Sequence, residues 1–299
     1  MSFRILPYSD LFVRYLLGDE RNKDLLLSFI NAVNEHQGLP RIASVSIVNP
    51  FNLSEYQYDK EGVIDVKATD EKGRQYDIEV QAQGTTHFVH RSLYYWARLY
   101  GSQLSKGHTY GLLRPTVCIN LLGFEMLAEQ PLVHACFVLR EKNCPELILT
   151  DHLVLHYLQL PCFEQQSDFS SAFERWMAFF KYAGSKEDVM RTILEDRAIS
   201  KAHEAYTVFT ADDRMRALYE SRQKWLHDVA TREEAAREEG MEKGLQKGRE
   251  EGREEGRLEA TRETREQTAR KLLAAGQTPD FVAEITGLSL ERIEELGRS

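Results

Sequence analysis

The chain has 299 residues, a hydrophobic content of 42% and a formal net charge of −9. The length fits one large domain with appendages, and the hydrophobic content is enough for a substantial core. The negative charge argues against a broad nucleic-acid-binding surface, but it leaves room for a locally basic cleft. No apolar run has membrane-spanning length and no signal-peptide pattern occurs at the start, so we expect a soluble cytoplasmic protein with no membrane partner.

The cysteines and histidines do not form a recognisable metal motif. No HExxH or CxxC spacing occurs, which predicts reduced structural thiols and argues against a zinc site. The four cysteines are Cys118, Cys136, Cys144 and Cys162. His87 and His90 lie three apart in a predicted helix and could meet a ligand, although surface positions of this kind are usually just polar.

The N-terminal region predicts two helices and a strand. Ser9 or Asp10 can cap the first helix, which runs to about Gly18. Asp24 begins the second, whose apolar stripe covers residues 25–34.

A β-hairpin follows a strand predicted over residues 42–48. Residues 62–69 and 75–81 both alternate polar and apolar side chains, which is typical of half-buried strands. Gly73 supplies the left-handed position of a three-residue loop, and this loop sets Asp65 directly opposite Glu79.

The polar face of this hairpin carries the candidate chemistry. Lys67, Asp77 and Gln81 share the face of Asp65 and Glu79. Two opposed carboxylates repel each other and become favourable when they hold a cation. The alternative is the solvated polar face of an ordinary hairpin, and the pattern alone leaves both interpretations open.

The rest of the first domain alternates a helix with further strands. Thr85 or Thr86 caps a helix that runs to about Leu104. Three apolar runs read as buried strands, the last as one strand or a pair: 116–124, 134–140 and 147–160. This order predicts an α/β domain with a mixed sheet over residues 1–165.

Beyond this domain the apolar spacing becomes helical. A helical subdomain is predicted over residues 166–230, with a long charged helix beginning near Ala211. Its apolar stripe favours core packing over a ligand site and comprises Phe169, Phe173, Trp176, Met177 and Phe180.

Residues 231–275 contain a glycine at every fourth position of a highly charged helix. Each glycine costs a helix about 1 kcal/mol relative to alanine, whereas an i,i+4 ion pair returns about 0.2–0.5 kcal/mol. The stripe lets two helix backbones approach closely, so we expect homo-oligomerisation through this segment; a flexible solvated linker is the alternative. The glycines are Gly240, Gly244, Gly248, Gly252 and Gly256.

The last segment, 276–299, predicts a small helical unit. Pro279 occupies a first helical turn, Gly287 stops that helix and Ser289 caps the next. The spacing is similar to a helix-turn-helix, but the last helix is acidic, so protein docking or capping is the better interpretation.

The hairpin could hold a hard divalent ion such as Mg²⁺, with Mn²⁺ or Ca²⁺ as alternatives. Asp65 and Glu79 would supply carboxylate oxygens and Val80 a carbonyl oxygen. Gln81 could orient a water by hydrogen bonding, and Lys67 on the same face could supply the positive charge that glutamine lacks.

Two arginines of the following helix are candidates for binding phosphate. Arg91 and Arg98 lie seven residues apart and therefore share a helix face. Ordinary surface charge is the alternative interpretation.

Several segments together resemble the PD-(D/E)XK nuclease family transposases, also called recombination-promoting nucleases. The resemblance covers residues 3–125, and the glycine-repeat tail is also similar to family members. The matching segments are 10–14, 22–26, 31–33, 64–66, 78–81, Arg91 and 94–95.

The resemblance implies a restriction-endonuclease-like fold and a metal-dependent DNA endonuclease. Asp65 and Glu79 match the metal-binding acids, and Asp10 matches an acid of the N-terminal helix that could equally be a helix cap. Gln81 occupies the position that is lysine in the wider superfamily.

Two rival functions remain besides an endonuclease that acts on DNA as an oligomer. One is a catalytically inactive, self-associating interaction protein on the same fold, favoured by the missing lysine and the acidic balance. The other is a DNA-recognition factor without cleavage, which is weaker because no basic recognition helix is visible.

Overall fold

The computed structural model describes residues 4–51, 66–84, 87–127, 129–165 and 168–298. The chain divides into two compact units, Met1–Lys224 and Trp225–Ser299. The predicted boundaries at residues 165, 230 and 275 stay predictions. No helix in the described part of the chain is long and apolar enough to cross a membrane.

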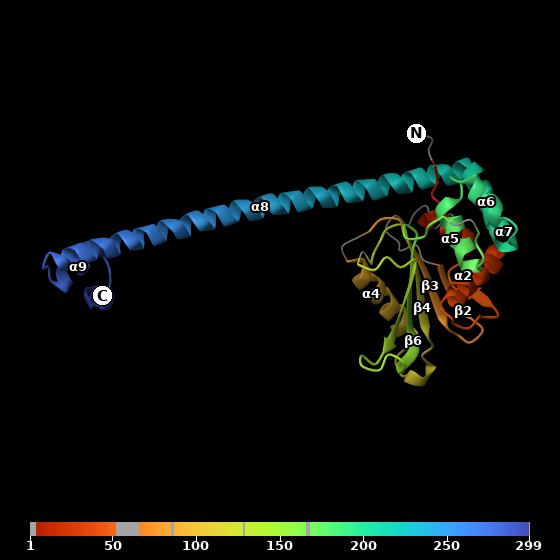
Figure 1. The fold of residues 1–299 in the computed structure, drawn as a ribbon, viewed down its shortest axis with the longest axis horizontal. Coiled ribbons are helices and arrows are strands. Elements are labelled where there is room, and N and C mark those ends of the chain that lie inside the picture. Colours follow the sequence, from red (N-terminus) through yellow and green to blue (C-terminus); the bar gives the residue numbers. More distant parts are fainter. Residues whose placement is uncertain (1–3, 52–65, 85–86, 128, 166–167, 299) are drawn as a thin grey trace. The chain divides into compact units, whose positions relative to one another are not determined.

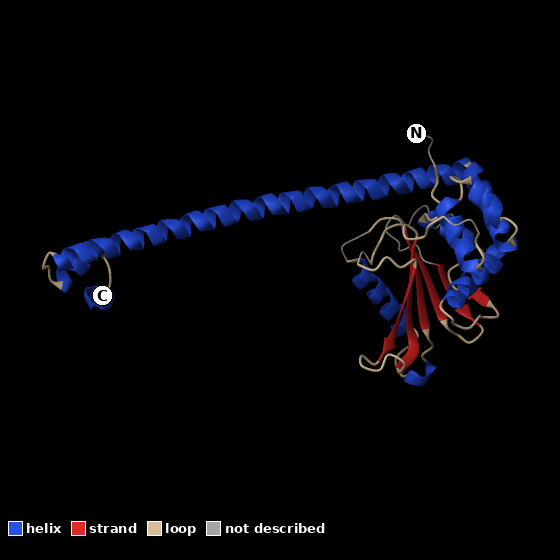
Figure 2. Ribbon diagram, viewed as in Figure 1, coloured by secondary structure: helices blue, strands red, loops and turns tan. Residues whose placement is uncertain are grey.

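The first unit is built on a six-stranded mixed sheet in the order β1-β2-β3-β4-β6-β5 (Figures 1 and 2). The β3–β4 and β4–β6 pairs are parallel, and the other three are antiparallel. The predicted α/β class with a mixed sheet is therefore confirmed. The strands are β1 (Val45–Ile47), β2 (Val66–Asp70), β3 (Gln75–Gln81), β4 (Thr116–Leu122), β5 (His134–Arg140) and β6 (Ile148–Gln159).

The β2–β3 hairpin has the predicted register. Lys67 pairs with Asp77, and Ala68 pairs with Tyr76. Gly73 has a φ of 79°, the left-handed conformation that the tight loop requires. Asp65 lies outside the described residues.

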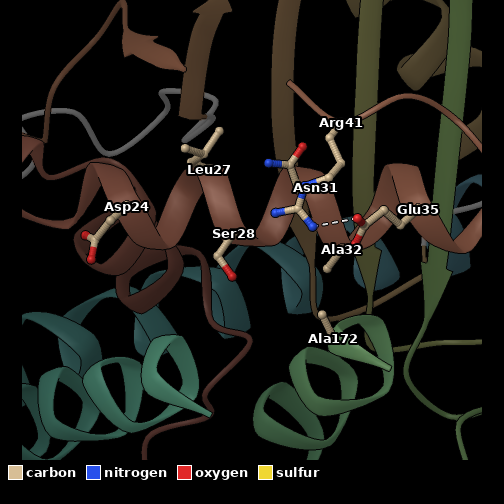
Figure 3. Close-up of a pocket in the computed structure, with 8 residues that line it drawn as sticks. All are labelled: Asp24, Leu27, Ser28, Asn31, Ala32, Glu35, Arg41 and Ala172. Carbon is tan, nitrogen blue, oxygen red and sulfur yellow. Dashed lines mark hydrogen bonds and ion pairs between the residues drawn. The ribbon is translucent and has the colours of Figure 1, made fainter. Parts of the chain in front are cut away.

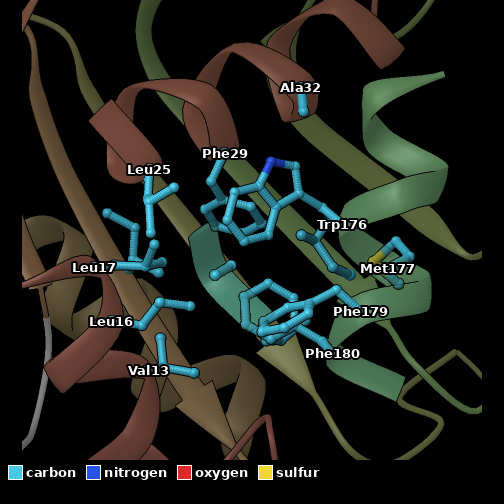
Figure 4. Close-up of a cluster of buried hydrophobic side chains, with 14 of the residues drawn as sticks. Val13, Leu16, Leu17, Leu25, Phe29, Ala32, Trp176, Met177, Phe179 and Phe180 are labelled. Carbon is cyan, nitrogen blue, oxygen red and sulfur yellow. The ribbon is translucent and has the colours of Figure 1, made fainter. Parts of the chain in front are cut away.

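One face of the sheet is covered by the N-terminal helices and the predicted helical segment. Trp176 of α5 stacks on its own helix neighbour Phe180 and meets Phe29 of α2 edge-to-face, each at a ring distance of 5.6 Å (Figure 4). The bounds are α1 (Asp10–Leu17), η1 (Glu20–Asn22), α2 (Lys23–His36), α5 (Ala172–Tyr182), α6 (Glu187–Ile193) and α7 (Arg197–Ala211).

Helix α4 (Phe88–Gly101) covers the opposite face, which Figure 1 shows beside the strands. Phe88 packs with Cys118, Leu155 and Tyr157 in a second, smaller core. A short helix η2 (Tyr110–Leu112) follows and leads into β4. On this face Asp77 and Glu79 of β3 are buried, whereas Lys67 and Gln81 are half-buried.

Several boundaries differ from the sequence-based expectation. Ser9 and not Asp10 is the cap of α1, since its hydroxyl accepts a hydrogen bond from the Phe12 amide. The expected strand or strand pair over 147–160 is the single strand β6, and the expected first strand is shortened to Val45–Ile47. The proposed caps Thr85 and Thr86 lie outside the described residues.

The second unit contains most of α8 (Asp213–Ala274), α9 (Pro279–Thr286) and α10 (Leu290–Arg298). Ala269, Val282 and Ile293, one from each helix, are fully buried against one another. Gly287 ends α9 in the left-handed conformation, as its position predicts. The glycine-repeat segment is helical throughout, and all five glycines are exposed.

Candidate active site

Glu79 is an acidic side chain on β3 that lies beneath α4. It is only 6% exposed, and Asp77 on the same face is 4% exposed. The alternation of β3 puts these acids on one side and Ile78 and Val80 in the main core on the other. The interpretation of this side as a solvated polar face is therefore wrong for both acids.

Arg91 of α4 provides the positive charge beside Glu79. Its Nη2 donates a hydrogen bond to Glu79 Oε1 at 2.9 Å, and its guanidinium lies 5.3 Å from the centre of the Phe88 ring. Its Nε is buried without a hydrogen-bond partner in the described part of the chain. Glu79, which the sequence predicts to be a metal ligand, therefore has a counter-ion within the protein.

Gln81 also contacts Glu79. Its Nε2 donates a hydrogen bond to the same Glu79 oxygen at 3.1 Å, so the two residues that match the family motif are held together. The negative charge of Glu79 also affects Tyr157. The pKa of Tyr157 is raised chiefly by burial and additionally by this carboxylate.

The Val80 carbonyl points toward the side of β3 on which β2 lies. The Gln75 amide donates to Pro115 and the Gln81 carbonyl accepts from Gly123, so odd-numbered residues of β3 bond to β4. Successive residues of a strand point their backbone groups to opposite sides, which turns Val80 toward β2. Lys67 of β2 is half-buried and pairs with Asp77, as predicted.

The two remaining predicted residues have different surroundings. Asp10 Oδ2 accepts a hydrogen bond from Arg222 Nε at 3.1 Å, and the two residues tie α1 to the start of α8. Arg98 is exposed in the last turn of α4, about 10 Å along the helix from Arg91. The structure therefore brings Glu79, Gln81 and Arg91 into direct contact, with Asp10 and Arg98 bound elsewhere or exposed.

A pocket of about 260 Å³ lies elsewhere, beside α2 and the start of α5 (Figure 3). Two of its lining residues, Arg41 and Glu35, form an ion pair at 2.5 Å. Glu79 does not line it. The pocket and the acidic strand are therefore separate features.

Sequence reasoning missed a chain of three histidines on the core face of the sheet. His36 Nδ1 lies 3.0 Å from His134 Nδ1, and His134 Nε2 lies 2.9 Å from His156 Nδ1. Phe173 stacks on the rings of His36 and His134. Burial lowers the pKa of His134 to about 2 and that of His156 to about 4, which keeps both rings neutral.

One signal for this cluster was present in the sequence. His156 has the same strand parity as Val154 and Leu158, which predicts that it faces the core. Its partners could not be predicted in this way, because His36 and His134 come from a distant helix and a neighbouring strand.

The described residues contain no group of three or more His, Cys, Asp or Glu side chains that could hold a metal ion. This finding leaves the proposed metal site open, because Asp65 is outside the described residues. The Glu79 carboxylate and the Val80 carbonyl are oxygen donors, which suit a hard divalent ion.

One comparison with known proteins identifies a family. The family model described as PD-(D/E)XK nuclease family transposase matches residues 7–236. A search of curated proteins found no match. A search of solved structures also found none.

Proposed function

Because the chain belongs to the PD-(D/E)XK nuclease family transposases and has their restriction-endonuclease-like fold, we propose that it is a metal-dependent DNA endonuclease of the recombination-promoting type. The observation that carries the proposal is the contact of Glu79 with Gln81 on β3, beneath α4. It joins the two described residues that match the family's acidic motif.

Asp65, Glu79 and the Val80 carbonyl are the proposed ligands of a divalent ion, with Mg²⁺ the first choice and Mn²⁺ or Ca²⁺ the alternatives. The described register runs to the Val66–Ile78 pair, and one further step would put position 65 opposite Glu79. Such an ion polarises a phosphate and lowers the pKa of a bound water.

The neighbouring side chains have roles that follow from their contacts. Gln81 offers an amide that can orient a water, and Lys67 lies on the adjoining strand opposite Asp77. Arg91 balances the charge of Glu79 and, with the exposed Arg98, forms a basic row for the phosphate backbone. We assign no catalytic role to Asp10, whose carboxylate is bound to Arg222.

We also propose that the protein acts as a homo-oligomer, since cutting two strands needs two sites. The support is the row of exposed glycines in α8, which leaves the helix backbone accessible to a second helix. A different function, an inactive interaction protein, is favoured by one observation: Arg91 already neutralises Glu79 without a metal.

The deciding experiment measures nicking of supercoiled plasmid by the pure full-length chain with Mg²⁺. Asp65→Asn and Glu79→Gln should abolish nicking, whereas Glu187→Gln, at a fully exposed acid of α6, should leave it unchanged. Calorimetric titration with Mn²⁺ gives a second readout, in which the two site variants should lose binding. Equal nicking by all four proteins would refute the assignment, and absent nicking with unchanged fold would favour the interaction protein.

A further inference from the structure

A long stretch of this acidic chain carries no acidic residue. The whole sequence has 47 Asp and Glu against 38 Lys and Arg, yet residues 80–124 contain neither Asp nor Glu. The same stretch carries Arg91, Arg98, Lys106 and Arg114. It includes all of α4, which therefore carries two arginines and no acidic residue over the face of the sheet where Glu79 lies.

The helical spacing places these charges on one side of α4. His87, Arg91, Tyr94 and Arg98 are separated by four, three and four residues, so they form a single row along the helix. We call this row the α4 flank. Phe88 and Ser92 are buried on the sheet side, which fixes the rotation of the helix and leaves the flank at its edge.

The flank begins at the candidate site and becomes more exposed along the helix. Arg91 contacts Glu79 and is partly buried, with a side-chain exposure of 34%. Tyr94 is 62% exposed, and its ring packs only edge-on against Tyr95 at 5.6 Å. Arg98 is exposed and has no carboxylate within ion-pair distance among the described residues.

An exposed tyrosine ring between two arginines fits a flexible nucleic-acid strand. Proteins bind single strands by stacking bases on aromatic rings and pairing the backbone with cations. A duplex keeps its bases stacked internally and would use the arginines but leave the ring without a partner. A protein partner could also use tyrosine and arginine, but the missing acids and the continuity with Glu79 favour a polyanion.

We propose that the α4 flank binds a single-stranded segment of DNA leading from the site, with Tyr94 stacking on a base and Arg98 pairing with a phosphate. This inference rests on the proposed nuclease function, because it takes the strand from that same site. It also narrows the substrate class to DNA that is single-stranded or locally opened beside the cleavage position.

The test is fluorescence anisotropy of a labelled oligothymidylate with the full-length protein in EDTA, so that cleavage plays no part. Tyr94→Ala should weaken binding about 5- to 150-fold, the range measured for loss of one stacked base, and Tyr94→Phe should restore it. Arg98→Ala should lower the slope of log affinity against log salt by about 0.7. Arg191→Ala, at an exposed arginine of α6, is the matched control and should change neither quantity.

Three outcomes would overturn the inference. The first is oligothymidylate binding by Tyr94→Ala equal to that of the unaltered protein. The second is a Tyr94→Ala variant that loses more affinity for a duplex than for a single strand of the same length. The third is a change of sedimentation from oligomer to monomer in Tyr94→Ala with DNA affinity retained, which would make the flank a self-association surface. Plasmid nicking is measured separately. If Tyr94→Ala still nicks plasmid and binds oligothymidylate as before, the α4 flank proposal is refuted and the nuclease proposal stands. If Tyr94→Ala loses binding but even the unaltered protein does not nick plasmid, the nuclease proposal alone is refuted.

Discussion

The histidine chain predicts that the first unit loses stability in mild acid. His134 and His156 are neutral in the fold, with pKa values of about 2 and about 4, against 6.5 for a free histidine. Below about pH 6.5 these two histidines bind protons in the unfolded chain but not in the folded chain. The free energy of unfolding therefore falls as the pH falls. At about pH 5 each ring accounts for about 2 kcal/mol, or about 4 kcal/mol for the two.

Burial keeps the rings neutral, and the neighbouring histidines add to the effect at His134. Each of the two nitrogen–nitrogen contacts holds one proton, and a second proton on His134 would force both neighbours to accept. Burial lowers the pKa of His36 as well, while Glu174 acts in the opposite direction. Protonation is therefore unfavourable chiefly because it places a charge in the core.

Urea unfolding followed by tryptophan fluorescence at about pH 8, 6 and 5 measures the effect. The unaltered protein should lose about 4 kcal/mol between about pH 8 and about pH 5, and His156→Leu should lose about 2 kcal/mol. His108→Gln, at an exposed histidine, is the control and should behave like the unaltered protein. A loss below about 1 kcal/mol, or the same loss in His156→Leu, would refute the reasoning.

Three further results are expected. Arg91→Met leaves Glu79 without its counter-ion and should cost about 2 kcal/mol in urea unfolding; Glu79→Gln in the same chain should recover most of it, and no recovery would mean that Arg91 acts through packing. Changing all five tail glycines to alanine should stabilise the helix by about 1 kcal/mol per residue, which circular dichroism would detect as increased helicity. The same change should weaken self-association measured by sedimentation, and unchanged sedimentation would exclude close helix contact at the glycines. Trp176→Ala should cost about 3–5 kcal/mol because the ring is buried between Phe29 and Phe180, and a loss below about 1 kcal/mol would contradict that packing.

Local patterns were enough to predict the hairpin and the residue that ends α9. Alternation in residues 75–81 and a glycine at position 73 determine the β2–β3 register, because a slip by one residue would exchange the core and polar faces. Gly287 stops α9 for a similar reason: the left-handed backbone there costs least with glycine.

The surroundings of the site depend on contacts between distant segments, which the sequence pattern does not contain. The burial of Glu79 comes from α4 packing on the sheet, and its pairing with Arg91 depends on the rotation set by Phe88. Similarly, Asp10 reads as a helix cap or an active-site acid, and its partner Arg222 lies more than 200 residues away in the chain. Periodicity predicts which face a side chain occupies but not which element covers that face.

The Glu79–Arg91 pair changes what the acidic strand requires for stability. Two opposed carboxylates would need a cation, but a guanidinium at 2.9 Å supplies that charge from within the protein. Separating such a pair is unfavourable if one partner remains buried and uncompensated. A divalent ion bound at Glu79 would provide the compensation, so we expect metal binding to release Arg91 toward a phosphate on the α4 flank. Metal affinity and DNA affinity should then each increase the other by the same factor, because linkage between two sites is reciprocal.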